Sequence, residues 1–122
     1  MEDFYYRKLR VYQEAMILLG EVYQLSQKFP IHELHGLTNQ IQRAAVSIPS
    51  NIAEGMGRFS IKERIRFIEI SNGSLMEVMC QLEIAQQLGY ILEEELKKEE
   101  NRISEIAKMM IGLRRNLEDK DK

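Results

Sequence analysis

Two histidines, three residues apart, are the only imidazole groups in this sequence and its first candidates for metal chemistry. His32 and His35 flank Glu33 in a short polar segment. Two imidazoles at this spacing can share a metal ion if the segment forms a helical turn. The spacing differs from the HExxH pattern of zinc proteases, and Glu33 is the only further ligand nearby. We therefore expect a solvent-exposed connector and no metal site.

Groups that usually carry catalysis are not visible elsewhere. Ser47 and Ser50 have no histidine near them in the sequence, which argues against a Ser–His pair. Cys80 lies within a helical pattern, where cysteine is more often a small core residue than a nucleophile. Gly55-Met56-Gly57 lacks the flanking strand and the later Lys-Ser/Thr of a phosphate-binding loop, and Glu-x-x-His pairs for a di-iron centre are absent. The sequence therefore predicts a protein that is not an enzyme and holds no cofactor.

The densest group of cations lies at a junction between two predicted helices and consists of Arg58, Lys62, Arg64 and Arg66. Lys62 and Arg66 are four residues apart and share one helix face. Clustered cations near a helix N-terminus can hold phosphate groups. The alternative is an ordinary solvated helix start, whose charge is offset by Glu63 and Glu69.

A second polar feature is one face of the segment 37–56, made by Asn39, Gln40, Arg43, Ser47, Ser50, Asn51 and Glu54. One interpretation is a hydrogen-bond network between helices around Pro49, and the other is a binding groove. Glu54 is placed to pair with Arg43 or Arg58. We favour the network, because short polar side chains beside a helical proline can satisfy neighbouring backbone groups.

Composition limits the protein to a single domain without a strong charge signal. The chain has 122 residues, 44% of them hydrophobic, with 17 Lys and Arg against 19 Asp and Glu. Its net charge of −2 argues against a typical nucleic-acid-binding domain, although residues 1–67 sum to +2 and residues 68–122 to −4. One cysteine excludes an intramolecular disulfide. Without a signal peptide or a long apolar run, we expect a cytoplasmic protein.

The elements that position these residues are four helices, predicted at about 9–28, 37–56, 60–88 and 93–117. Each has apolar residues at spacings of three and four. We expect Pro49 to kink a continuous second helix, and Ser60 with Glu63 to cap the third. In the fourth, a seven-residue apolar repeat is interrupted only by Glu99. The sequence predicts an all-α fold, an antiparallel up-down four-helix bundle in one domain, 1–122.

The third predicted helix is apolar around most of its circumference. Phe67, Ile70 and Val78 lie on a different arc from Ile68 and Leu75. A lone bundle cannot bury every side of such a helix. We therefore expect a homo-oligomer and assign Phe67, Ile70 and Val78 to its interface.

The second helix and its surroundings also resemble a known family, through the run Gly36-Leu37-x-x-Gln40-Ile41-x-Arg43-Ala44-x-x-Ser47-Ile48-Pro49-Ser50-Asn51-Ile52-Ala53-Glu54-Gly55-x-Gly57-Arg58. This is the bacterial family of four-helix-bundle proteins encoded in 23S rRNA intervening sequences. The resemblance extends over roughly residues 9–117, and its motif residues are Ser47, Pro49, Asn51, Glu54 and Gly55. The sequence departs from the family pattern at Tyr12, where we expect Trp, and at Ser71-Asn72, where Ala-Arg is common.

The resemblance implies a ring-like assembly, typically a homopentamer. A related branch, the accessory proteins of diversity-generating retroelements, binds nucleic acid and a reverse transcriptase through a basic surface. Carried onto this chain, the resemblance implies nucleic-acid contacts at Arg43, Arg58, Lys62 and Arg66. Our leading hypothesis is a non-enzymatic oligomeric scaffold with RNA or another nucleic acid as candidate partner. The alternative is a protein-only adaptor, which the net charge favours.

The apolar excess of the third helix predicts that the purified chain is an oligomer. Light scattering should therefore give a mass of several protomers. A mass near 14.3 kDa, that of one chain, would refute the prediction.

Overall fold

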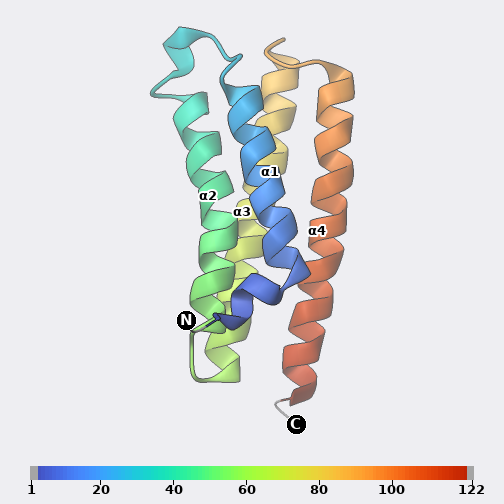
Figure 1. Cartoon of the computed structure of the whole chain (residues 1–122). Coiled ribbons are helices and arrows are strands. Elements are labelled where there is room, and N and C mark those ends of the chain that lie inside the picture. Colours follow the sequence, from blue (N-terminus) through green and yellow to red (C-terminus); the bar gives the residue numbers. More distant parts are fainter. Residues whose placement is uncertain (1–2, 121–122) are drawn as a thin grey trace.

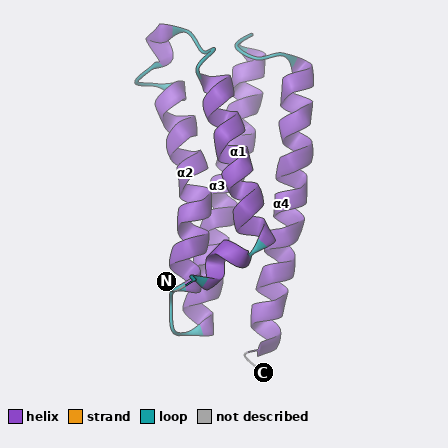
Figure 2. Cartoon of the chain, in the orientation of Figure 1, coloured by secondary structure: helices purple, strands orange, loops and turns teal. Residues whose placement is uncertain are grey.

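Four long helices and two short 3-10 turns make up residues 3–120, the part of the chain that the computed structural model describes. The elements in chain order are η1 (Tyr5–Lys8), α1 (Arg10–Ser26), η2 (Ile31–Glu33), α2 (Leu37–Met56), α3 (Ile61–Gln87) and α4 (Glu93–Lys120). Each long helix runs antiparallel to the next one along the chain (Figure 1). Helices and loops account for all of the described residues, without a strand (Figure 2). The predicted four-helix bundle is confirmed, while its assembly into a ring stays a prediction.

Local capping interactions fix where the helices begin and end. Ser60 Oγ accepts the N–H of Glu63 at 3.1 Å, which is the capping contact expected at the start of α3. Gly89 has φ of +80°, a backbone conformation that favours glycine, and it follows the end of α3. α1 ends two residues before its predicted end, because the chain turns there toward Pro30. α4 continues to Lys120, three residues past its predicted end.

The α2–α3 pair has the most extensive helix contact in the bundle, and small polar residues lie within it. Pro49 is buried inside one continuous α2. Next to it, Ser71 Oγ of α3 donates to the carbonyl of Ile48 at 2.8 Å. The hydroxyls of Ser47 and Ser74 lie 2.8 Å apart, and Asn51 Nδ2 donates to Ser47 O and Oγ, both at 2.8 Å. Of the predicted polar face, Ser47 and Asn51 therefore take part in a hydrogen-bond network beside Pro49.

Burial on α3 differs from the sequence expectation at several positions. Val78 is fully buried in the core of the protomer and Phe67 is 7% exposed beneath Arg58, so neither has much surface for a second copy. Ile70 is 40% exposed and keeps its predicted role as an interface residue. Cys80, expected in the core, is exposed. α2 packs against α3 and covers part of the arc that contains Phe67 and Val78.

At Gly55, α2 lies so close to α3 that a side chain would not fit. A Cβ placed there would lie 2.7 Å from Phe67 Cβ and 3.4 Å from the carbonyl oxygen of Arg64. Both are parts of α3 that cannot rotate away. The absence of a side chain at Gly55 is therefore what allows α2 and α3 to approach closely beside their connecting turn.

We predict that Gly55→Ala destabilises the protein by about 1–3 kcal/mol, because α2 and α3 must separate to admit the methyl group. Gly20→Ala in α1 is the matched control, since a Cβ there meets nothing within 4 Å. Helix propensity alone should make the control more stable by up to ~1 kcal/mol. Urea denaturation measures both variants. Equal effects on the free energy of unfolding would contradict the packing assigned to Gly55.

Candidate functional site

The cations at the turn between α2 and α3 are held by ring and backbone contacts. The Arg58 guanidinium lies over the Phe67 ring at 4.6 Å, and that of Arg66 lies 5.7 Å from the same ring. Arg64 Nε donates to the carbonyl of Arg58 at 2.7 Å, which ties the turn to the first turn of α3. The acidic partners are exposed side chains: Glu54 lies 3.8 Å from Arg58 and Glu63 lies 3.5 Å from Arg66. Exposed pairs of this kind contribute little stability.

Two further residues complete the basic end of the bundle, which we define as Arg58, Phe59, Lys62, Arg64 and Arg66. The Lys62 side chain is exposed and has no hydrogen bond or ion pair within residues 3–120. Phe59 is 101% exposed, the highest value of any large apolar side chain described. The turn therefore combines an unpaired lysine, three arginines and a bare aromatic ring.

The antiparallel fold gathers opposite charges at opposite ends of the bundle. The half with the α2–α3 turn comprises residues 3–17, 48–72 and 106–120. It has eleven Lys and Arg against seven Asp and Glu, a net charge of +4. The other half, residues 18–47 and 73–105, has five against ten, a net charge of −5. The nearly neutral sequence therefore folds into a molecule with a basic end and an acidic end.

Arg43 lies apart from the other three predicted nucleic-acid contacts. It precedes Arg58 by fifteen residues, roughly 20 Å along α2 at 1.5 Å per residue. It lines an open hollow of about 520 Å³ between α2 and α3, together with Asn39, Gln40, Ala44, Ser47, Ser74, Glu77 and Gln81. Gln81 Oε1 is buried in this region without a hydrogen-bond partner. The structure brings Arg58, Lys62 and Arg66 together and leaves Arg43 outside their cluster.

The remaining motif residues have structural contacts. Glu54 pairs with Arg58 rather than with Arg43, one of the two partners expected from the sequence. Gly55 allows the close contact with Phe67.

Around the histidines, Tyr90 O–H donates to Glu33 Oε2 at 2.8 Å, and Glu33 Oε1 accepts the N–H of Leu37 at 3.2 Å. These hydrogen bonds lower the pKa of Glu33. Within residues 3–120, no three His, Cys, Asp or Glu side chains form a metal-binding group.

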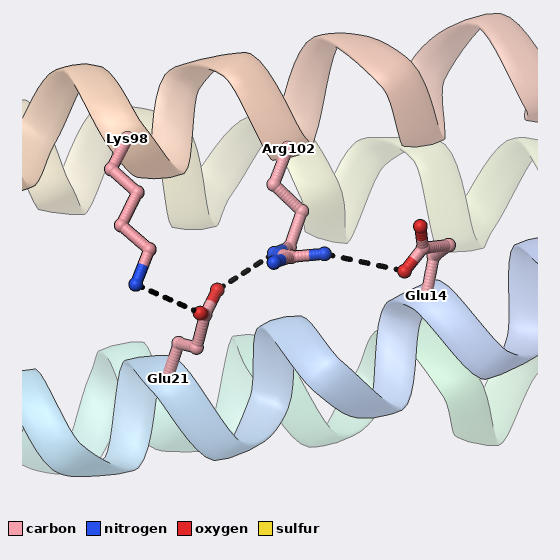
Figure 3. A network of polar contacts seen from close by, with 4 residues as sticks. All are labelled: Glu14, Glu21, Lys98 and Arg102. Atoms are coloured by element: carbon pink, nitrogen blue, oxygen red, sulfur yellow. Dashed lines mark hydrogen bonds and ion pairs between the residues drawn. The ribbon is translucent and has the colours of Figure 1, made fainter.

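A network of charges joins α1 to α4 (Figure 3). Arg102 donates to Glu21 at 2.7 Å and to Glu14 at 3.2 Å, and Lys98 lies 3.2 Å from Glu21. Glu99, the polar residue in the apolar repeat, is 2% exposed, and its Oε1 has no hydrogen-bond partner within residues 3–120. The network therefore surrounds a buried carboxyl group on the inner face of α4.

The pKa values of the two neighbouring carboxyl groups, Glu99 and Glu21, shift in opposite directions from their ordinary values. Burial raises the pKa of Glu99 to about 7, and a hydrogen bond with Glu21 adds to the rise. Burial also acts to raise the pKa of Glu21, but hydrogen bonds with Glu99, Arg102 and Lys98 outweigh it and lower that pKa. The protonated form of Glu99 is therefore the one that fits beside an ionised Glu21.

Sequence reasoning missed two of these features. Phe59 stands alone between Arg58 and Ser60, and no periodicity marks a residue in a turn as exposed. The Arg102–Glu21 pair joins positions 81 residues apart, so no local spacing reveals it. The position of Glu99 in the apolar repeat was the available signal for a buried carboxyl group beside this network.

Comparisons with known proteins agree with this architecture. A family model described as 23S rRNA-intervening sequence protein matches residues 7–112. A crystal structure from Bacteroides thetaiotaomicron, a protein of unknown function from the S23 ribosomal protein family, is 24% identical with a TM-score of 0.77. The match covers 85% of this chain and 97% of that one, and at this identity it supports the fold alone. No curated protein matches. None of the described helices is long and apolar enough to cross a membrane.

We predict that the contribution of Glu99 to the stability of the protein falls as pH rises from about 4.5 to 7, because the folded state keeps the Glu99 proton that the unfolded state releases. A shift of this size corresponds to about 3 kcal/mol. Glu99→Gln has a side chain that is neutral at every pH, so it should remove this part of the dependence of the free energy of unfolding on pH. Exposed Glu100→Gln is the matched control. Urea midpoints measured at pH 5 and pH 7.5 test the prediction, and equal slopes for wild type and Glu99→Gln would refute it.

Proposed function

The chain belongs to the 23S rRNA-intervening sequence protein family, and from this membership and its basic end we propose a non-enzymatic scaffold that self-assembles and binds RNA. The pentamer implied by the resemblance is the proposed assembly, and the cytoplasm its proposed location. The observation that carries the RNA proposal is the segregation of charge, +4 in one half of the bundle against −5 in the other. A polyanion is attracted to the first half although the whole chain is acidic.

Contacts at the basic end favour phosphate as its ligand. Lys62 has no acidic partner among the described residues and is exposed. Arg58 and Arg66 pack against the face of Phe67, while their side chains stay 46% and 61% exposed. Their pairs with Glu54 and Glu63 are weak enough for phosphate oxygens to replace. These three side chains therefore supply positioned cations close to one another.

Exposed apolar side chains on α3 support self-assembly. Ile70 and Ile84 of α3 and Leu88, the residue directly after the helix, are 40%, 42% and 53% exposed, and their spacing places them on one side of it. A second copy of the chain would bury these side chains. An oligomer would also repeat the basic end, so that several weak phosphate contacts act on one RNA strand.

We predict that RNA binding weakens steeply with salt. Three phosphate contacts per protomer on a single strand give a slope of about −2 in log K against log salt. Reversing Arg58, Lys62 and Arg66 together to Glu should abolish binding at about 50 mM salt, measured by fluorescence anisotropy. The absence of binding by the wild-type protein at this salt would refute the proposal and favour the protein-only adaptor.

Two single variants serve as controls for this experiment. Lys97→Glu changes an exposed cation of the acidic half and should leave the affinity unchanged. Arg43→Glu should also have little effect, because its distance from the basic end exceeds the screening length of about 10 Å at 0.1 M salt. If Arg43→Glu alone abolishes binding, the RNA site lies along the α2–α3 hollow instead.

A further inference from the structure

Phe59 is a large apolar side chain that the protomer leaves entirely in water. Phe29 and Phe67 are buried, each 7% exposed, whereas Phe59 is 101% exposed. Removing such a ring from water against a partner is favourable. The ring makes no contribution of this kind within the fold, so it is free to contact a partner.

The turn that presents Phe59 is fixed on both sides. Before it, the N–H of Arg58 donates to the carbonyl of Gly55 at 3.0 Å. After it, Ser60 caps α3, and Arg64 Nε holds the carbonyl of Arg58 at 2.7 Å. Binding therefore requires little ordering of the backbone, which lowers the entropic cost of a contact with the ring.

The charged residues nearest to Phe59 in the sequence are cations. Arg58 and Lys62 lie one and three residues from Phe59, and Lys62 has no partner among the described residues. The guanidinium of Arg58 packs on Phe67, so the faces of Phe59 are not covered by that cation. A ring with both faces in solvent beside unpaired positive charge matches a nucleotide, which presents a flat base and a phosphate.

More exposed aromatic side chains lie in the same half of the bundle. Phe4 and Tyr5 are 53% and 55% exposed, and Arg7 lies 5.0 Å from the centre of the Phe4 ring. The 3-10 turn η1 that begins at Tyr5 contacts α2, the helix that leads to the basic end. The basic half therefore has exposed aromatic rings as well as cations.

We infer that Phe59 is a stacking platform for an unpaired nucleobase, so that the ligand of the basic end is a single-stranded nucleic acid. The inference rests on the proposed function and specifies its ligand. A duplex has its base faces covered by neighbouring bases and can reach only the cations. A single strand can place a base on Phe59 and its phosphates near Lys62 and Arg58.

The sequence contains no tryptophan, which allows a direct test. Phe59→Trp supplies a unique fluorophore whose emission a stacked base quenches. We would titrate the full-length variant with a 12-nucleotide single-stranded RNA and with a 12-base-pair duplex of the same sequence. We expect the single strand to quench the emission and the duplex to leave it unchanged. Binding of the single strand without quenching would overturn the inference.

Phe59→Ala measures the contribution of the ring to affinity. It should weaken single-strand binding by roughly tenfold and leave duplex binding unchanged. Tyr23→Ala, which removes an exposed aromatic ring of the acidic half, is the matched control and should have no effect.

Other outcomes separate the two proposals. If Phe59→Ala binds the single strand as tightly as wild type while the triple charge reversal abolishes binding, RNA binding stands and stacking is refuted. If the wild-type protein binds neither RNA, both proposals fail. A decrease of the oligomer mass in Phe59→Ala would assign the ring to self-assembly and overturn the inference.

Discussion

The close contact between α2 and α3 is the constraint on which the rest of the structure depends. Phe67 lies so close to Gly55 that a side chain at this position would not fit. The hydrogen bond between Ser47 and Ser74 fixes the register of the two helices near their middle. Ser71 satisfies the Ile48 carbonyl beside the proline. Because these contacts are short and polar, α2 and α3 have one register in which all of them form. The turn that joins the helices is positioned by that register.

The distribution of charge between the two ends of the bundle depends on the same helix packing. Antiparallel packing places the basic start of α3 beside the end of α2 and near the end of α4, whereas the acidic start of α4 lies at the opposite end of the bundle (Figure 1). A chain with a net charge of −2 therefore acquires a half of +4. The charge network between α1 and α4 lies beside a buried carboxyl group, that of Glu99. Burial favours the protonated form of Glu99, so this side of the bundle is sensitive to pH.

The sequence was sufficient for the fold because helix periodicity, Pro49 and the Ser60 cap are local signals. It was also sufficient for the cluster of Arg58, Lys62 and Arg66, whose members are near one another in the chain. It could not show that Arg43 lies apart from this cluster, since a shared motif on α2 does not imply a shared end. It misjudged Val78 and Cys80, because an apolar arc alone does not indicate which side a neighbouring helix covers. The exposure of Phe59 depends on the path of the turn, which no spacing encodes.

The central claim is that nucleic acid binds at the end of the bundle formed by the α2–α3 turn. Amide hydrogen exchange with and without single-stranded RNA tests this most directly, because it locates the contact without a substitution. The account predicts slower exchange within residues 57–66, with the acidic half unchanged. Slower exchange confined to residues 39–47 or 93–102 would contradict it.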